Sequence, residues 1–291
     1  MIQINKLGMA VITGAAGGFG SCFARRLAER GHNLLLIDRR DKELRELCDS
    51  IEKDYGVTAE SLVVDLTNMD QVADLAEQLE GREGIEYLIN NAGFAHRRDF
   101  SDISVDRHCD MVYLHVNTPM QLTRAVLPGM IERNCGNIIN LSSLGAWLAA
   151  GDVQYAATKT YLIVLSQELQ EELWDTNIRV QALCPSFVDT GFHNTTEMTS
   201  FPRHSIPKRL WMTSDAVIDC SLKSLEHRNR PIVVPGWRNK IMCAALRARI
   251  TQPIIRWFER RNKKKLQPDV QRREIELNES TSRDDSKARS R

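Results

Sequence analysis

The chain has 291 residues, of which 42% are hydrophobic and 26% are charged, and its formal net charge at pH 7 is +1. These proportions are typical of a soluble globular protein, and the balanced charge gives no reason to expect nucleic acid as a partner. The seven cysteines are scattered without CxxC spacing, so we expect a reducing compartment and no disulfide framework or metal site. No apolar stretch approaches the length of a membrane span, and the first residues lack the apolar core of a secretory signal. We therefore expect a cytoplasmic protein.

Seven short apolar runs alternate with longer segments of helical spacing. The runs are Met9–Thr13, Asn33–Ile37, Ser61–Val64, Tyr87–Asn90, Asn137–Leu141, Arg179–Leu183 and Ile232–Val234. The helical segments are Ser21–Arg30, Asp41–Asp54, Asp70–Glu80, Asp106–Arg133 and Val153–Asp175. Strands that alternate with helices pair in parallel through right-handed crossovers. The pattern predicts an α/β fold, with a single domain over 1–237 built as a doubly wound, Rossmann-type parallel sheet of about seven strands.

The composition changes after this domain. Residues 238–261 mix apolar side chains with arginines and predict a basic amphipathic helical extension, and 262–291 predict a disordered charged tail. The extension has two interpretations. Such a stretch more often packs on its own domain or on a partner subunit, with arginine stems covering apolar surface. Alternatively, it makes a peripheral contact with a membrane surface, its arginines toward anionic headgroups.

A glycine-rich turn follows the first apolar run. Gly14, Gly18 and Gly20 stand in TGAAGGFG (13–20), between a predicted strand and a predicted helix. Glycines let the backbone approach a diphosphate, and the helix N-terminus presents N–H groups to it. A glycine cluster alone also occurs in tight turns that bind nothing. The position between strand and helix is what predicts a dinucleotide site.

Asp38 ends the second apolar run, where a carboxylate can accept hydrogen bonds from the adenosine ribose of a dinucleotide. A carboxylate there would also repel a 2′-phosphate, so we expect NAD as the preferred cofactor. The adjacent Arg39 and Arg40 act in the opposite direction, because arginine pairs readily with phosphate, and they keep NADP as the alternative.

Tyr155 and Lys159 are four residues apart at the start of a predicted helix, so they share one face of it. A cation beside a phenol favours the phenolate and lowers the phenol pKa toward working pH. A phenol tuned in this way can exchange a proton with a substrate oxygen while a hydride moves at the adjacent carbon. By itself the spacing arises often by chance. Its position after a dinucleotide turn, within an α/β pattern, points to an oxidoreductase.

With these motifs in place, the chain resembles the short-chain dehydrogenase/reductase superfamily, in its single-domain branch. The motifs that carry the resemblance are TGAAGGFG (13–20), Asp65 in VVDLT, Asn90-Asn91-Ala92-Gly93, Asn117 in HVNTP, Asn140-Leu141-Ser142-Ser143, Tyr155 with Lys159, and PSFVDT (185–190). They follow the family's order over roughly residues 6–236, which makes the resemblance specific.

The resemblance implies a role for each matching residue. Tyr155 would be the general acid/base, Lys159 would lower its pKa and bind the nicotinamide ribose, and Asn117 would support a proton-relay water. Asp65 and Leu66 would border the adenine, and Val188 and Thr190 would contact the carboxamide. The full set of implied cofactor-binding residues is Gly14, Gly18, Phe19, Gly20, Asp38, Arg39, Asp65, Leu66, Asn91, Ala92, Gly93, Tyr155, Lys159, Val188 and Thr190. A homodimer or homotetramer is also implied.

The catalytic serine has two candidates, which together with Tyr155 would contact the substrate. The family's usual spacing to the tyrosine selects Ser142, whereas alignment of the preceding strand selects Ser143. Strand ends are fixed by sheet geometry and loops absorb deletions, so we favour Ser143. Ser186 departs from the family, which usually has glycine after the proline.

The predicted function is transfer of a hydride between NAD(P) and a carbonyl or alcohol, as in a ketone reductase. A predicted lid, 191–210, contributes Phe192, Met198 and Phe201, so we expect a hydrophobic, lipid-like or sterol-like substrate. Leu144 and Trp147, in the loop before Tyr155, are expected to add to this lining. The alternative is a dinucleotide-sensing binding protein without turnover, against which the intact tyrosine and lysine argue.

Overall fold

The computed structural model describes residues 7–96, 98–147, 152–190, 207–226 and 230–247. The chain divides into two compact units, Met1–Cys243 and Ala244–Arg291. The fold described below is that of the first unit, in which the last described helix, α8 (Trp237–Arg247), begins. Residues 248–261 of the predicted extension and the predicted tail at 262–291 lie outside the described residues.

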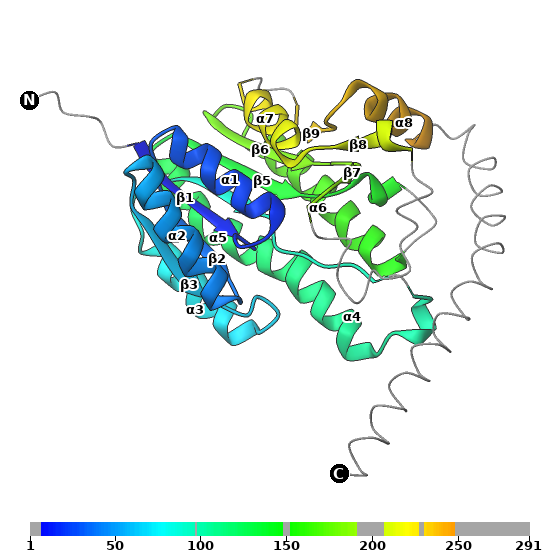
Figure 1. The fold of residues 1–291 in the computed structure, drawn as a ribbon, viewed down its shortest axis with the longest axis horizontal. Helices are drawn as coiled ribbons and strands as arrows, with labels where there is room; N and C mark the ends of the chain where they lie inside the picture. Colours follow the sequence, from blue (N-terminus) through cyan, green and yellow to red (C-terminus); the bar gives the residue numbers. More distant parts are fainter. Residues whose placement is uncertain (1–6, 97, 148–151, 191–206, 227–229, 248–291) are drawn as a thin grey trace, which may run out of the picture. The chain divides into compact units, whose positions relative to one another are not determined.

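Seven parallel strands form the central sheet in the order β3-β2-β1-β4-β5-β6-β9 (Figure 1). They are β1 (Leu7–Thr13), β2 (His32–Asp38), β3 (Ala59–Val63), β4 (Ile85–Asn90), β5 (Gly136–Leu141), β6 (Ile178–Leu183) and β9 (Ile232–Val233). The order turns at β1, with β2 and β3 on one side and β4, β5, β6 and β9 on the other. This is the predicted doubly wound, Rossmann-type sheet.

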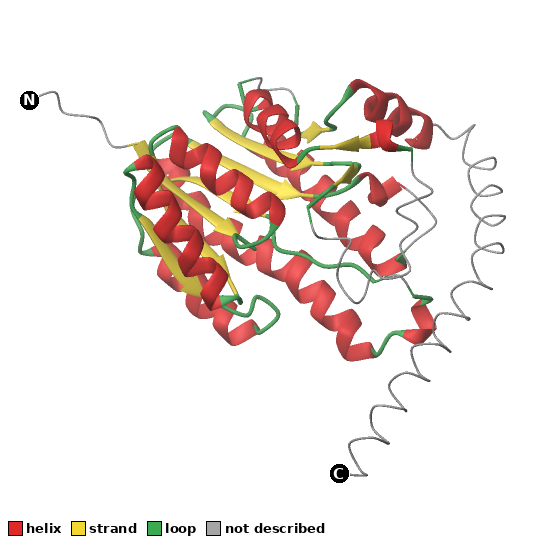
Figure 2. Ribbon diagram, in the orientation of Figure 1, coloured by secondary structure: helices red, strands yellow, loops and turns green. Residues whose placement is uncertain are grey.

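Helices cover both faces of this sheet (Figure 2). One face carries α1 (Gly18–Glu29), α2 (Asp41–Tyr55) and α7 (Ser214–Ser224). The other carries α3 (Met69–Glu80), α5 (Thr118–Glu132) and the end of α6 (Val153–Glu172). Because both faces are covered, the strands are buried on both sides, which is why they appear in the sequence as continuous apolar runs.

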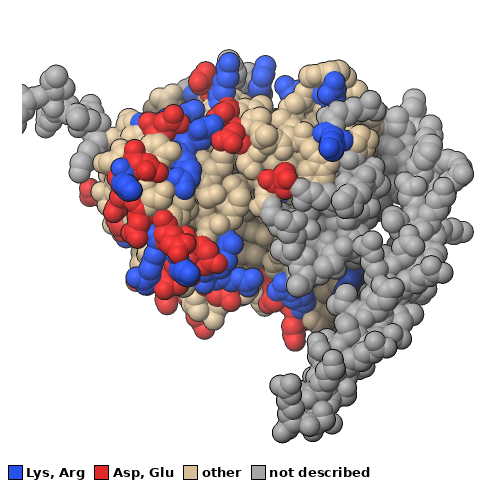
Figure 3. Space-filling view, in the orientation of Figure 1, with Lys and Arg blue, Asp and Glu red and all other residues tan. Residues whose placement is uncertain are grey.

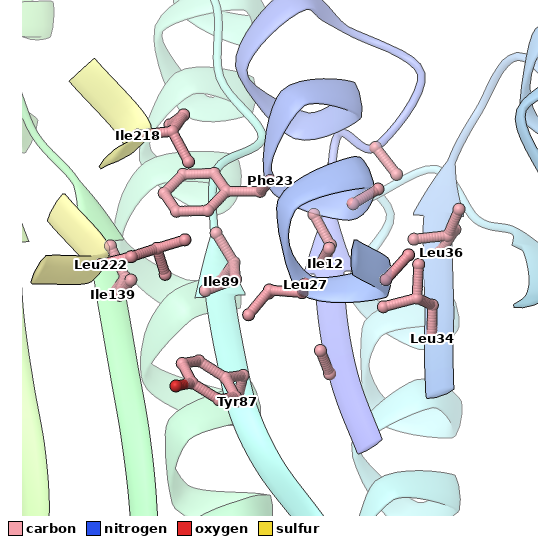
Figure 4. Packing of buried hydrophobic residues seen from close by; sticks show 14 of the residues in the cluster. Ile12, Phe23, Leu27, Leu34, Leu36, Tyr87, Ile89, Ile139, Ile218 and Leu222 are labelled. Atoms are coloured by element: carbon pink, nitrogen blue, oxygen red, sulfur yellow. The ribbon is translucent and has the colours of Figure 1, made fainter. Parts of the chain in front are cut away.

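Alternate strand residues supply the two halves of the core. In β1, Ile12 belongs to the cluster under α1, whereas the adjacent Val11 belongs to the cluster on the opposite face. Phe23 and Leu27 of α1 lie over Ile12 and Ile89 (Figure 4), and all four side chains are fully buried. Each such side chain stabilises the fold by about 1.5–3 kcal/mol. This packing fixes α1 over the sheet, with its N-terminus at the carboxyl end of β1.

One predicted helix is divided into three parts. The segment Asp106–Arg133 contains α4 (Val105–Val112), a π-helical turn (Tyr113–Asn117) and α5. The Thr118 N–H donates to the Tyr113 carbonyl five residues back, so one extra residue is accommodated in the turn. The predicted helix therefore extends over the whole segment, with a π-helical turn between its two α-helical parts.

Two elements near the site had no counterpart in the sequence-based prediction. They are α7 and a small parallel sheet of β7 (Phe187–Val188) and β8 (Trp211–Met212). Phe187–Val188 and Trp211–Met212 are too short to show a periodic pattern in the sequence. Among the described helices, none is both long enough and apolar enough to cross a bilayer. On the face shown in Figure 3, basic and acidic side chains of the described surface are largely interspersed.

Candidate active site

A cavity of about 840 Å³ lies at the carboxyl ends of the central strands. In an open parallel sheet this is the edge at which ligands bind, and β1 is where the strand order turns. Most of the predicted site residues line the cavity: Gly14, Gly18, Phe19, Asp38, Arg39, Asp65, Leu66, Asn91, Ala92, Gly93, Ser142, Ser143, Tyr155, Lys159, Val188 and Thr190. Gly20 and Asn117 are not among the lining residues. The fold therefore brings together segments from the whole length of the domain.

The glycine-rich turn forms one wall of the cavity at the start of α1. Gly14 has φ +63°, in the left-handed region that glycine adopts easily. A Cβ on Gly18 would lie 2.5 Å from the Thr190 carbonyl oxygen, and one on Gly20 would lie 2.2 Å from that of Gly14. The helix has no side-chain cap at Gly17 and no acidic residue in its first turn. Its first N–H groups therefore face the cavity uncapped, which suits a diphosphate.

Asp38 is buried at the carboxyl end of β2, and protein donors surround its carboxylate. Oδ2 accepts a hydrogen bond from the Ala16 N–H at 3.0 Å, which ties the end of β2 to the glycine turn. Arg40 donates from Nε to Oδ1 and from Nη2 to Oδ2, both at 3.0 Å. This bidentate pair raises the pKa of Arg40, chiefly through the hydrogen bonds to Asp38. From the sequence, Arg40 was expected to oppose the NAD preference that Asp38 predicts. In the structure the two side chains are paired directly.

Asp65 is held by its own turn. Its Oδ1 accepts hydrogen bonds from the Thr67 N–H at 3.0 Å and from the Thr67 hydroxyl at 2.7 Å. Burial alone would raise the pKa of Asp65, but these bonds and the positive charges of Arg39 and Arg107 lower it. Arg107 also lies over the Phe94 ring, with 4.0 Å between its guanidinium carbon and the ring centre. Arg107 comes from α4, and no motif in the sequence pointed to it.

Tyr155 and Lys159 lie together on the first turns of α6, where both line the cavity; Lys159 is buried and Tyr155 is partly buried. The Lys159 Nζ donates to the Leu141 carbonyl at 2.7 Å and lies 5.5 Å from the centre of the Tyr155 ring. Burial raises the pKa of Tyr155 to about 12, against the opposing effect of its hydrogen bond with Ser143. Burial also lowers the pKa of Lys159 to about 7. Desolvation therefore raises the pKa of Tyr155, whereas the sequence predicted that Lys159 would lower it.

The two candidate serines have different partners. The Ser142 hydroxyl is buried and donates to the Lys159 backbone carbonyl at 2.8 Å, so it ties the end of β5 to α6. The Ser143 hydroxyl accepts a hydrogen bond from the Gly145 N–H at 2.9 Å and is also hydrogen-bonded to Tyr155. These contacts support Ser143 as the serine that faces the substrate.

We expect Ser143→Ala to lower kcat by about 10²-fold, since it removes a hydroxyl that would hydrogen-bond the substrate oxygen as charge develops there. Ser142→Ala is the matched control, with the same change one residue earlier. It should lower the thermal stability, because a buried hydrogen bond is lost, and leave kcat within a few-fold of wild type. Steady-state rates and thermal unfolding of both variants measure this. The reverse order of the two kcat values would assign the role to Ser142.

His115 is a site residue that sequence reasoning did not identify. Its imidazole is fully buried in the π-helical turn. The ring Nε2 accepts a hydrogen bond from the Phe94 N–H at 3.1 Å, and the ring Nδ1 lies 3.0 Å from the Thr158 hydroxyl. Because Nε2 accepts, Nδ1 carries the proton and donates to Thr158. Burial, with the nearby charge of Lys159, lowers the pKa of His115 well below its usual value. The neutral ring thus ties the Gly93–Phe94 wall to α6 between Tyr155 and Lys159.

Other predicted residues lie away from the cavity wall. Asn117 ends the π-helical turn, next to the α5 residues that pack on the sheet. Leu144 is buried in a small core cluster, and Trp147 packs against that cluster, so neither is among the residues that line the cavity. Residues 191–206 of the predicted lid are not described. Among the described residues, no group of three or more His, Cys, Asp or Glu side chains is arranged to hold a metal ion.

Comparison with known proteins gives a consistent result. The family model described as short chain dehydrogenase matches residues 8–200. The NADP-dependent 3-hydroxy acid dehydrogenase of Shigella flexneri is 34% identical over 190 residues, which cover 64% of this chain and 75% of that protein. A short-chain dehydrogenase from Sphingobium yanoikuyae, solved in complex with NADPH, is 29% identical with a TM-score of 0.75, over 82% of this chain and 92% of that one. A bulky-bulky ketone specific alcohol dehydrogenase from Comamonas testosteroni is 27% identical with a TM-score of 0.71, over the same shares of the two chains.

Proposed function

Since the chain belongs to the short-chain dehydrogenase/reductase family and is a nicotinamide-dependent oxidoreductase acting on CH–OH groups, we propose that Tyr155 is its general acid/base. One observation carries this proposal. The Tyr155 hydroxyl is hydrogen-bonded to Ser143 on the wall of the glycine-lined cavity, and Lys159 lies beside it. The uncapped N-terminus of α1 and the absence of Cβ atoms at Gly18 and Gly20 fit a dinucleotide against that wall.

When bound, the nicotinamide supplies or accepts the hydride. For reduction, Ser143 and Tyr155 both hydrogen-bond the substrate carbonyl oxygen, and Tyr155 gives it a proton as the alkoxide forms. Protonated Lys159 would stabilise the resulting phenolate by its charge, and solvent would return a proton to the phenolate before the next turnover. Oxidation uses the same groups in reverse. We assign Asn117 a supporting position in proton supply.

We propose NAD as the preferred cofactor. Asp38 is buried and fixed by the Ala16 N–H, so a 2′-phosphate at the end of β2 would lie against an immobile carboxylate. Arg40 opposes this NAD preference, because its guanidinium already neutralises the Asp38 carboxylate and could turn toward a phosphate. Among the similar proteins, the 3-hydroxy acid dehydrogenase is NADP-dependent and the Sphingobium yanoikuyae enzyme was solved with NADPH, so these two favour the alternative cofactor.

Fluorescence titration with NADH and NADPH tests the cofactor preference. We expect wild type to bind NADH more tightly, and Arg40→Ala to increase the NADH:NADPH affinity ratio by about tenfold, because it removes one cation from a phosphate site. Arg45→Ala is the matched control, since Arg45 makes a comparable ion pair with Asp41 away from the cavity. Tighter binding of NADPH by wild type would overturn the NAD preference and leave the assignment as oxidoreductase intact.

We propose a hydrophobic alcohol or ketone as the substrate. Phe94, Leu114, Pro185 and Val188 give the described wall an apolar character, and the ketone-specific relative acts on bulky substrates. The test is a series of ketones of increasing chain length, with a 3-hydroxy acid and a small sugar as further arms. We expect kcat/KM to rise by up to about tenfold for each two added methylenes that are buried, at about 0.8 kcal/mol each. A preference for the acid or the sugar would reject the hydrophobic substrate. The homodimer or homotetramer and the cytoplasmic location stay predictions from the sequence.

A further inference from the structure

The C-terminal helix α8 presents two large apolar side chains on its outer face. Trp237 is 66% exposed and Ile241 is 61% exposed, and they are four residues apart on the same face of the helix. Surface helices of globular proteins usually bury such a pair. In α8 the opposite face is the one that packs inward, since Asn239 and Cys243 are buried.

Specific contacts fix which face of α8 points outward. The Asn239 side-chain amide donates to the Pro235 carbonyl at 2.9 Å and lies 3.3 Å from the sulfur of Met212. Met212 belongs to β8, which lies beside α8 in Figure 1. Asn239 is 3% exposed, so turning the helix to bury Trp237 would break a buried hydrogen bond and expose a packed surface. The exposed apolar pair is therefore a stable feature of the fold.

The charged residues of α8 itself all have one sign. Arg238 and Lys240 are exposed on α8, and the Arg238 guanidinium lies 5.0 Å from the centre of the Trp237 ring. The helix contains no acidic residue. In the sequence, 238–265 contains ten Lys and Arg residues and a single acidic residue, Glu259, although the whole chain has a net charge of only +1. Apolar side chains set among basic ones match the interface of an anionic membrane.

From this arrangement we propose that the outer face of α8, centred on Trp237 and Ile241, docks on an anionic lipid surface. A second copy of the chain is a poorer occupant. A two-fold contact would bring Arg238 and Lys240 against their own copies, and stable interfaces bury on the order of 1,200–2,000 Å², far more than two side chains supply. On a lipid surface, the same basic residues meet opposite charge while the tryptophan and isoleucine enter the headgroup region.

Co-sedimentation of the full-length protein with vesicles tests the proposal. We expect binding to vesicles of phosphatidylcholine with phosphatidylglycerol, little binding to phosphatidylcholine alone, and release at high salt. The double variant Trp237→Ala/Ile241→Ala should weaken binding by at least about tenfold, as should Arg238→Glu/Lys240→Glu. Trp174→Ala is the matched control, because Trp174 is 72% exposed just after α6 and lies outside the proposed surface. It should bind like wild type.

The proposal is overturned by equal binding to neutral vesicles, by an equal loss in Trp174→Ala, or by wild-type binding in both double variants. Size-exclusion chromatography with light scattering is run in parallel. If Trp237→Ala/Ile241→Ala converts an oligomer into monomers, the face is an interface between copies and the lipid proposal fails. The double variants leave the cavity residues unchanged, so their rates with a water-soluble ketone should equal that of wild type and show that they are folded.

Discussion

Tyr155→Phe should lower kcat by about 10² to 10⁴-fold, because it removes the only group proposed to exchange a proton with the substrate oxygen. The ring stays in place, so the wall of the cavity changes by one oxygen atom. NADH binding, followed by fluorescence, should remain within about twofold of wild type, because the hydroxyl is assigned to the substrate rather than to the cofactor. Loss of rate without loss of binding is the signature of a group that acts in the transition state.

Tyr161→Phe is the matched control for this variant. Tyr161 lies on the same helix, outside the lining of the cavity, so its hydroxyl should affect neither measurement. Turnover that persists in Tyr155→Phe would show that the proposed proton transfer is wrong. A wild-type protein that binds NADH but turns over none of the carbonyls or alcohols in the series would favour the dinucleotide-sensing alternative.

Gly20→Ala should weaken NADH binding by about 5- to 150-fold, on the basis that overpacking at such a position costs about 1–3 kcal/mol. The added Cβ would lie 2.2 Å from the Gly14 carbonyl oxygen and 2.7 Å from the Ala15 Cα. Both are backbone atoms, so the whole glycine turn has to move away from α1. Gly20 does not line the cavity, and its effect would act through the position of the turn.

Gly81→Ala is the matched control for Gly20→Ala. Gly81 follows α3 with φ −82°, and a Cβ there would have its nearest neighbour at 3.9 Å. This variant should bind NADH like wild type. Circular dichroism and thermal unfolding establish that Gly20→Ala is folded at the assay temperature. Gly18→Ala provides a second test, since its Cβ would meet Thr190 at 2.5 Å from across the cavity. Wild-type affinity in both variants would contradict the proposed cradle.

The strands and most of the cofactor wall could be predicted from the sequence, because each depends on local signals. A run such as Leu34–Ile37 is buried on both faces of the sheet, so it is apolar without interruption. The glycines mark a turn whose geometry excludes side chains. The π-helical turn could not be predicted in this way, because a single extra residue leaves the segments on both sides of it with ordinary helical spacing. His115 lies within this turn and is fully buried.

The alternatives that the sequence left open depend on contacts between distant parts of the chain. Ser142 and Ser143 are adjacent and chemically identical, and only the position of α6 separates the one that bonds the Lys159 carbonyl from the one that meets Tyr155. Arg107 reaches the cavity from a helix that has no motif. The sequence likewise left both interpretations of 238–261 open, and the membrane surface is our proposal for the first turns of α8.

The bond between Lys159 and the Leu141 carbonyl has a consequence for the entropy of cofactor binding. A lysine side chain loses up to about 2 kcal/mol of rotamer freedom when it is fixed. Here the 2.7 Å bond is made within the chain, so this loss occurs on folding rather than on binding. An ammonium has three N–H donors, and the bond uses one of them. When protonated, Lys159 is thus a preorganised group that can donate to the ribose hydroxyls.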